Sequence, residues 1–414
     1  MQWRGNRAWW VLLVVALGLR IAIVVVQGGQ LSIDRDAYLE IARHIVAGEG
    51  FSLGEPPHPT AYRPPLYPLV IAALFACGGT AYALGAVQVI LGTATVLLAG
   101  RVACRFGGNS ARLAAGALVA VDPLLLQYTA QPMTETLAAF LATGWLAVLA
   151  VRSDETPLLR WQIVSGVLLG LGVLCRPIFL VVAGLFALLE LVARGPGITS
   201  SRRFQRIGIL FVAVGVTLLP WIARNALVMG KPIATTTHGG YTLFLANNPV
   251  MYDEVICGAW GTTWDDASLR SWQAKLDRET EGMSEIERDR WMSAQARETI
   301  RSQPRMFLYA CGWRILRLWD VLPRGPQISS ATRFVMPVVA VFYIAIYVAF
   351  LVGCLTSIGD NPSLWRPVLA LLLGFTLLHT LYWTDARMRA PLMPAVAVVA
   401  AQGLIATFGR RRAT

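Results

Sequence analysis

Apolar runs of about 20 residues recur along most of the chain, separated by short polar stretches. A helix needs about 20 mostly apolar residues to cross a bilayer, and a soluble core does not require so many such runs. The pattern predicts an all-α polytopic integral membrane protein with about ten transmembrane helices. The predicted spans cover residues 8–27, 82–104, 112–129, 134–151, 161–176, 177–193, 206–223, 334–355, 364–383 and 391–408.

Arginine residues orient these spans, because short cytoplasmic loops carry an excess of Lys and Arg. An arrangement with both ends in the cytoplasm places every arginine cluster on that side. The clusters are Arg4 and Arg7; Arg101, Arg105 and Arg112; Arg194, Arg202, Arg203 and Arg206; and Arg410, Arg411 and Arg412. The apolar segment 64–77 would reverse every later loop if it spanned the membrane. It is also short and begins with two prolines, so we expect a short helix in the outer interface.

Composition and charge agree with the membrane class. The 414 residues are 56% hydrophobic and 14% charged, whereas soluble domains carry about 25% charged residues. The net charge of +12 comes largely from arginines in short loops, so it does not indicate a nucleic-acid partner. The six cysteines form no CxxC motif or metal-ligand spacing. Cys257 and Cys311 can pair if their compartment is oxidising, unless Cys311 faces the membrane.

Two long segments are expected on the outward face and divide the chain into three regions. Residues 1–224 are an N-terminal transmembrane module that includes the outward loop 28–63. Residues 225–333 are a helical outward segment, and residues 334–414 are the C-terminal transmembrane helices. Within the outward segment, Ser284 and Glu287 form a capping box, and Pro304 suits the first turn of a second helix. Met306, Phe307, Trp313, Leu316 and Trp319 make this second helix amphipathic and predict that it lies on the membrane surface.

Two acidic residues stand at the start of a predicted juxtamembrane helix within residues 33–50. Tyr38, Ile41, Ala42, Ile45 and Val46 share one helical face. Asp34 and Asp36 precede that face, just outside the membrane. A structural interpretation is that Asp34 caps the helix and Asp36 favours its dipole. A catalytic role is compatible with the same positions.

Basic residues at outer helix ends run against the positive-inside bias and suggest an anionic ligand. Arg63 follows Tyr62 in a proline-rich segment, and its planar fork suits a phosphate group. Arg176, Arg387 and Arg389 lie at the outer ends of other spans. The alternative for all of them is contact with ordinary lipid phosphates.

Other polar residues occur beside these spans. Glu135 begins the fourth span and should face a polar cavity or act in the helix cap, because a carboxylate that faces lipid is costly. His238 and Asn247 lie just after the seventh span, where a structural turn is a better interpretation than a metal site.

Several short motifs follow one another in a fixed order. Asp34, Tyr38 and Ala42 form D-x-x-x-Y-x-x-x-A. The later motifs are TAYRPPLYPL at 60–69, TETL at 134–137, RP at 176–177, PWIARN at 220–225, NNP at 247–249, QPRMFL at 303–308, RLW at 317–319 and RMRAPLMP at 387–394. This order resembles the bacterial branch of the protein-mannosyltransferase superfamily, glycosyltransferase family 39. Relatives of that branch include the aminoarabinose transferases that modify lipid A.

The resemblance implies a GT-C fold with an outward catalytic cleft in the cytoplasmic (inner) membrane. It implies a sugar donor linked to polyprenyl phosphate, inversion at the anomeric carbon, and a lipid, glycan or protein acceptor in the cell envelope. The catalytic acid of the first loop maps to Asp34, with Asp36 as the alternative, and a second acid maps to Glu135. Residues that match the carrier-phosphate and substrate contacts are Arg63, Arg176, Arg387, Arg389, Tyr62, His238 and Asn247.

Relatives vary in a divalent metal near the site, so a metal stays possible from sequence alone. The rival functions are a transporter or flippase of lipid-linked sugars and a polysaccharide ligase. A transporter more often places its charged residues near the bilayer midplane. Arg20 lies deep in the first span, where it can snorkel or meet a partner helix.

Overall fold

The computed structural model describes residues 7–151, 158–192, 199–264, 267–322, 324, 330–357 and 362–409. Helices account for nearly all of its regular structure, so the predicted all-α class is confirmed. The α-helices are α1 (Arg7–Gln27), α2 (Tyr38–Val46), α3 (Leu66–Ala76), α4 (Ala81–Ala120), α5 (Pro123–Gln127), α6 (Glu135–Val151), α7 (Leu158–Cys175), α8 (Phe179–Val192), α9 (Ser200–Met229), α10 (Gly239–Ala246), α11 (Ala267–Glu279), α12 (Glu285–Ser302), α13 (Pro304–Leu318), α14 (Ser330–Ser357), α15 (Pro362–Leu381) and α16 (Met393–Gly409). The 3₁₀ helices are η1 (Gly28–Ser32), η2 (Tyr128–Ala130) and η4 (Ala386–Leu392), and η3 (Met251–Ile256) is a π-helix. Strands β1 (Ser52–Leu53) and β2 (His58–Pro59) form a small antiparallel hairpin.

Each of the ten predicted spans falls on a helix. Among the described residues, six helical segments are long and apolar enough to cross a membrane, judged by length and composition: Arg7–Ser32, Ala81–Ala120, Ser200–Met229, Phe334–Ser357, Leu364–Leu381 and Ala386–Thr407. The shorter apolar helices α6, α7 and α8 occupy three further predicted spans. The predicted short helix at 64–77 is α3, whose 11 residues are too few to span a bilayer.

Helix α4 supplies two predicted spans because it folds back on itself. Gly107 and Gly108 leave the helical conformation, and Gly108 has a φ of 66°, which glycine adopts without strain. Gly100 and Gly116, on opposite sides of this bend, both pack against the Trp9 ring, so the two arms run antiparallel. The second arm ends at Ala120, short of the predicted residue 129, because Asp122 caps the separate helix α5.

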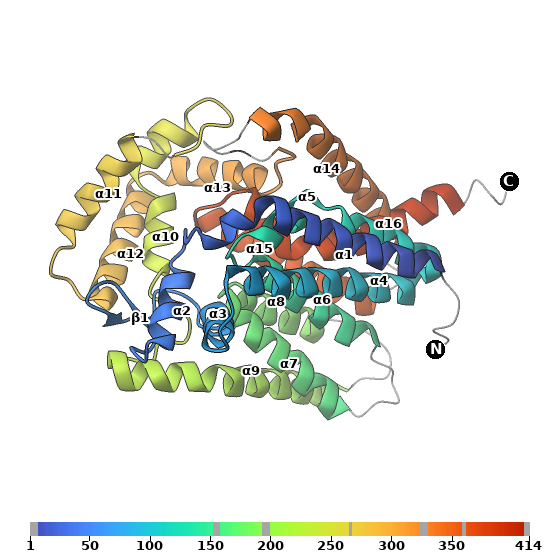
Figure 1. The fold of residues 1–414 in the computed structure, drawn as a ribbon, viewed down its shortest axis with the longest axis horizontal. Coiled ribbons are helices and arrows are strands. Elements are labelled where there is room, and N and C mark those ends of the chain that lie inside the picture. Colours follow the sequence, from blue (N-terminus) through green and yellow to red (C-terminus); the bar gives the residue numbers. More distant parts are fainter. Residues whose placement is uncertain are drawn as a thin grey trace.

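Different segments of the chain lie at the two ends of the bundle (Figure 1). Both chain termini lie at one end, whereas α2, β1 and helices α10 to α13 lie at the other. The bend in α4 lies at the same end of the bundle as the start of α1. Trp9, near the start of α1, packs on both arms of α4 beside the bend. This arrangement agrees with the predicted grouping of loops, although the sidedness of each loop stays a prediction. Of the predicted cytoplasmic arginines, Arg4, Arg194, Arg410, Arg411 and Arg412 lie outside the described residues.

Arg20 meets a partner helix inside the bundle. Its side chain is fully buried, and its Nη2 donates to the carbonyl oxygen of Val119 at 3.2 Å. Its Nη1 donates to the carbonyls of Ala16 at 3.1 Å and Ala120 at 3.4 Å. A guanidinium group at the last carbonyls of a helix is stabilising, so Arg20 ties α1 to the end of the second arm of α4.

The helices of the outward segment begin where the sequence places them. Ser284 and Glu287 form the predicted capping box of α12, and Pro304 is the first residue of α13. On α13, Leu316 is exposed and Trp313 is buried, and the position of this helix on the membrane surface stays a prediction. All six cysteines are free, so the possible pairing of Cys257 with Cys311 is not found.

Candidate active site

Residues from four distant parts of the chain meet beside α2. They come from the loops around α2, from the loop before α3, from the junctions at α6 and α8, and from η4. The predicted residues that the structure brings together are Asp36, Arg63, Glu135, Arg176 and Arg387. We call these five the charged cluster.

Asp36 is at the centre of the first half of the charged cluster. Arg63 Nη2 donates to Asp36 Oδ1 at 2.9 Å, and Arg63 Nε donates to the Asp36 backbone oxygen at 2.8 Å. Arg387 Nη1 lies 3.6 Å from Asp36 Oδ2. Each carboxylate oxygen of Asp36 therefore faces a guanidinium group.

The contacts of Asp34 differ from those of Asp36, and helix α2 starts later than predicted. Helix α2 begins at Tyr38 after Ala37, whose φ of 60° is in the left-handed region. Asp34 is therefore not the N-cap, but its Oδ2 accepts a hydrogen bond from the backbone N–H of Glu40 at 2.7 Å, in the first turn. Its Oδ1 is buried and has no hydrogen-bond partner. One oxygen positions the side chain and the other is available to a ligand.

Glu135 and Arg176 form the second half of the charged cluster. Glu135 is the first residue of α6 and is fully buried. Its Oε1 accepts a hydrogen bond from Arg176 Nη2 at 2.6 Å, while its Oε2 has no partner. Arg176 also contacts Thr134 Oγ1 at 2.8 Å and the sulfur of Met388 at 3.9 Å, which connects this pair to the segment that carries Arg387.

The two arginines of the RMRAP motif occupy different environments. The buried Nε of Arg387 lies 3.4 Å from Asp385 Oδ2, which is an ion-pair contact and not a hydrogen bond. Arg389 is buried, and its Nη1 donates to the backbone carbonyls of Leu318 and Asp320, each at 2.7 Å. Arg387 therefore keeps donors for a ligand, whereas Arg389 fastens the end of α13.

Tyr62 and His238 border the charged cluster. The guanidinium carbon of Arg63 lies 4.8 Å from the Tyr62 ring centroid, and the rings of Tyr62 and His238 meet edge to face at 4.3 Å. Burial lowers the pKa of His238 well below its usual value, and the charges of Arg63 and Arg387 lower it further. His238 is therefore neutral near pH 7, and its Nδ1 is buried without a partner.

Asn247 lies apart from the charged cluster and is occupied by packing contacts. Its Nδ2 donates to the carbonyls of Leu243 at 2.9 Å and Leu381 at 2.8 Å. Its Oδ1 accepts from Tyr252 Oη at 2.9 Å and from Arg314 Nη2 at 3.0 Å. The amide joins α10, α13 and α15.

Two residues that organise the site escaped the sequence analysis. Glu285 accepts hydrogen bonds from Thr60 Oγ1 at 2.5 Å, from the Ala61 N–H at 2.9 Å and from Thr237 Oγ1. Arg224 donates to the carbonyls of Thr60 at 2.6 Å and Phe51 at 2.7 Å. Both residues hold the loop that leads to Arg63. Arg224 lay within a recognised motif, but Glu285 is 225 residues from Thr60 and carries no local signal.

The side chains of the charged cluster do not fit a metal ion. Over the described residues, no group of three or more His, Cys, Asp or Glu side chains converges as a ligand set. Asp36 and Glu135, which a cation would need, each face arginine instead. We therefore derive no step through a metal.

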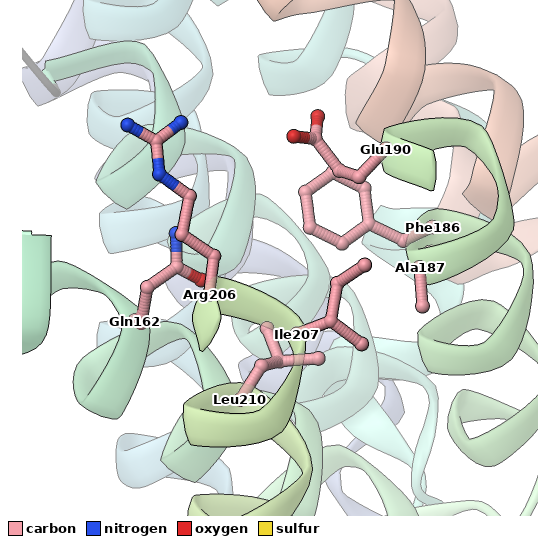
Figure 2. Close-up of a pocket in the computed structure, with 7 residues that line it drawn as sticks. All are labelled: Gln162, Phe186, Ala187, Glu190, Arg206, Ile207 and Leu210. Carbon is pink, nitrogen blue, oxygen red and sulfur yellow. The ribbon is translucent and has the colours of Figure 1, made fainter. Parts of the chain in front are cut away.

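A separate small pocket lies between α7, α8 and α9 (Figure 2). It is lined by Gln162, Phe186, Ala187, Glu190, Arg206, Ile207 and Leu210. Glu190 and Arg206 stand on opposite sides of it, and Glu190 is paired with Arg366 at 3.0 Å. None of its lining residues belongs to the charged cluster, so it adds nothing to that site.

Comparison with known proteins gives a partial sequence match and several structural matches. Residues 62–221 match the family described as dolichyl-phosphate-mannose-protein mannosyltransferase. No curated protein matches the sequence significantly. The fold is similar to the oligosaccharyltransferase AglB from Archaeoglobus fulgidus, in complex with an inhibitory peptide and a dolichol-phosphate. That match has a TM-score of 0.57 and 13% identity, and covers 100% of this chain and 52% of that chain.

Two further structures are also similar to this chain. The Archaeoglobus fulgidus oligosaccharyltransferase with Zn and sulfate matches with a TM-score of 0.55 and 13% identity, over 97% of this chain and 49% of that chain. ArnT from Cupriavidus metallidurans bound to undecaprenyl phosphate matches with a TM-score of 0.48 and 14% identity, over 97% of this chain and 78% of that chain. The chain spans about half the length of the oligosaccharyltransferase structures.

Proposed function

From the premise that this chain is an integral membrane protein with the GT-C fold, we propose that it is a glycosyltransferase. It moves a sugar from a polyprenyl-phosphate carrier to an acceptor in the cell envelope. Two observations carry the proposal. Asp34 presents a buried carboxylate oxygen without a hydrogen-bond partner. Arg387 makes ion-pair contacts with Asp36 and Asp385, and no side-chain hydrogen bond uses its guanidinium group among the described residues.

The proposed reaction assigns the proton to Asp34. An acceptor hydroxyl attacks the anomeric carbon of the sugar while Asp34 Oδ1 takes the hydroxyl proton as general base. The new carbon–oxygen bond forms as the bond from the anomeric carbon to the phosphate oxygen breaks. Attack opposite the leaving group inverts the anomeric configuration. The electron pair of the broken bond stays on the carrier phosphate, which leaves as free polyprenyl phosphate.

The arginines of the charged cluster suit that leaving group. Charge on the carrier phosphate grows as the bond breaks, and fixed donors in a partly buried site stabilise this charge. Arg387 is the main candidate, because no side-chain hydrogen bond uses its guanidinium group among the described residues. Arg63 pairs with Asp36, and Arg176 pairs with Glu135.

The comparisons support the class of donor. The matched family is described by a dolichyl-phosphate-linked mannose donor, and the AglB complex contains a dolichol-phosphate. A carrier tail of this kind stays in the bilayer, which accounts for a site at the ends of membrane helices. We place that end on the outward face of the inner membrane, because the arginine-rich loops favour the opposite side.

A donor-turnover assay tests the proposal against a flippase. The full-length protein is reconstituted in liposomes that contain a sugar-loaded undecaprenyl phosphate and an extract of envelope acceptors. A transferase releases free undecaprenyl phosphate, and Asp34→Asn abolishes the release. Movement of the intact donor between leaflets without such release would support a flippase and contradict the proposal.

A further inference from the structure

Three buried oxygen atoms around the charged cluster have no hydrogen-bond partner. They are Oδ1 of Asp34, Oε2 of Glu135 and the hydroxyl of Tyr67. Glu135 and Tyr67 are almost completely buried, with exposures of 0% and 3%. Buried polar groups are nearly always paired, so an unpaired group in a native structure calls for a water molecule or a ligand.

Ring contacts place Tyr67 beside the charged cluster, because the guanidinium carbon of Arg63 lies 5.5 Å from the centroid of the Tyr38 ring, on which Tyr67 packs. Its ring packs edge to face on Tyr38 at 5.2 Å, and Tyr38 is the first residue of the helix that Asp34 precedes. Burial raises the pKa of the Tyr67 hydroxyl well above its usual value, and Glu135, Tyr38, Cys175 and Asp34 raise it further. The hydroxyl keeps its proton and is available as a donor.

The three groups select the chemistry of their ligand. Two carboxylate oxygens need donors, and the phenol can both donate and accept. A phosphate offers few donors and is repelled by two carboxylates. A sugar offers several hydroxyl groups, each of which can donate and accept.

We propose that Tyr67 is a substrate-binding residue that holds a hydroxyl of the transferred sugar beside the charged cluster. The arginines then bind the carrier phosphate, Tyr67 and Glu135 face the sugar attached to it, and Asp34 Oδ1 faces the acceptor hydroxyl. This inference rests on the proposed function and adds Tyr67 as a residue that distinguishes a loaded carrier from an empty one.

The test compares binding of loaded and empty carriers to Tyr67→Phe. This variant removes the hydroxyl and keeps the ring that packs on Tyr38. The full-length protein in lipid nanodiscs is titrated with bare undecaprenyl phosphate and with the same carrier loaded with a hexose, a pentose or an aminopentose. Tyr347→Phe is the matched control, because its hydroxyl is also buried without a partner but lies on α14, near Arg389.

We expect Tyr67→Phe to raise the Kd of the preferred loaded carrier about tenfold, which corresponds to about 1.4 kcal/mol. Binding of bare carrier should stay within about twofold. The apparent melting temperature should not fall, because the lost hydroxyl has no partner in the folded protein. The Tyr347→Phe control should bind every carrier like the wild type.

The other outcomes overturn the inference. Equal weakening of loaded and bare carriers, or a clear fall in melting temperature, would assign Tyr67 a structural role. Unchanged binding of the loaded carriers would also remove Tyr67 from the site. If the wild type still releases undecaprenyl phosphate in the turnover assay, the proposed function survives either result. If the wild type binds none of the three loaded carriers more tightly than the bare one, the assignment of this subsite to sugar fails.

Discussion

Asp34 Oδ2 accepts a hydrogen bond from the backbone N–H of Glu40 at 2.7 Å, while Asp34 Oδ1 stays buried without a partner. An Asn at this position keeps an acceptor for the Glu40 N–H but cannot take a proton. We therefore expect Asp34→Asn to lower sugar transfer by ~10²-fold or more. The melting temperature should stay close to that of the wild type. Release of undecaprenyl phosphate and thermal unfolding in detergent measure the two effects.

Asp36→Asn is the control for this substitution. It weakens the ion pairs with Arg63 and Arg387, so we expect it to act mainly on the KM for the donor. Transfer at the wild-type rate by Asp34→Asn would move the base to Asp36 or Glu135.

Replacement by Ala should have different effects at Arg387 and at Arg389. Arg387→Ala removes a donor proposed for the carrier phosphate, so kcat/KM should fall by about ten- to a hundredfold, as for loss of one charge-assisted bond. Arg389→Ala leaves the carbonyls of Leu318 and Asp320 without their buried donor and should destabilise the fold by ~2–4 kcal/mol. Donor titrations and unfolding in mixed micelles distinguish the two losses.

The conservative substitution gives the check on Arg387. Lys keeps the charge but loses the planar fork, so Arg387→Lys should recover only part of the activity. Full turnover by Arg387→Ala at low donor concentration would remove Arg387 from the phosphate site.

The ten helical segments could be predicted because an apolar run of the right length is a property of the local sequence. The outer arginines could also be placed at helix ends, because their positions follow from the span boundaries. The different roles of residues that are close together in the sequence could not be predicted. The turn at Ala37, with φ 60°, follows both Asp34 and Asp36 and starts α2 only at Tyr38, and such a conformation is uncommon for a residue other than glycine.

The difference between Arg387 and Arg389 has a similar local cause. Both lie in the 3₁₀ helix η4, where three residues make a turn, so side chains two residues apart point in directions about 120° apart. The sequence predicts an α-helical span near this position and does not indicate the tighter turn. Glu285 could not be found at all, because its contact with Thr60 depends on how the outward segment docks on the bundle.

Topology can be tested at two exposed positions on opposite ends of the bundle. A cysteine in place of Glu281 should react with a membrane-impermeant maleimide on intact cells. A cysteine in place of Gln205 should react only after the membrane is permeabilised. Both positions are exposed, so lack of labelling reports sidedness and not burial. The background needs Cys77→Ser and Cys257→Ser, because both thiols are exposed. Labelling of residue 205 from outside would refute the predicted orientation.

His238 should make stability depend on pH. Burial and the nearby arginine charges keep its pKa in the folded protein well below the usual value of 6.5. Below about pH 6.5 the unfolded chain binds a proton that folded His238 does not bind. The stability that neutral His238 contributes is therefore complete above about pH 6.5 and is lost as the pH falls, by at most ~1.4 kcal/mol per pH unit.

His238→Gln should flatten this dependence. We expect the melting temperature of the variant to fall less than that of the wild type between about pH 7 and pH 5. His58→Gln is the matched control, because His58 is exposed on β2 and should leave the profile unchanged. Equal slopes for the wild type and His238→Gln would contradict the assignment.

Glu135 and Arg176 should behave as a coupled pair. Removing one partner leaves the other charge buried and unpaired, which typically costs ~3–5 kcal/mol. Both Glu135→Gln and Arg176→Gln should therefore destabilise strongly, and the double variant should lose less than their sum. A double-mutant cycle by unfolding in mixed micelles should give a coupling of ~1–3 kcal/mol. The exposed pair Lys275–Glu279, at 3.8 Å with side-chain exposures of 68% and 43%, is the reference and should couple by less than ~0.5 kcal/mol. A coupling for Glu135 and Arg176 no larger than this reference would show that their 2.6 Å contact does not hold α6 to the start of α8.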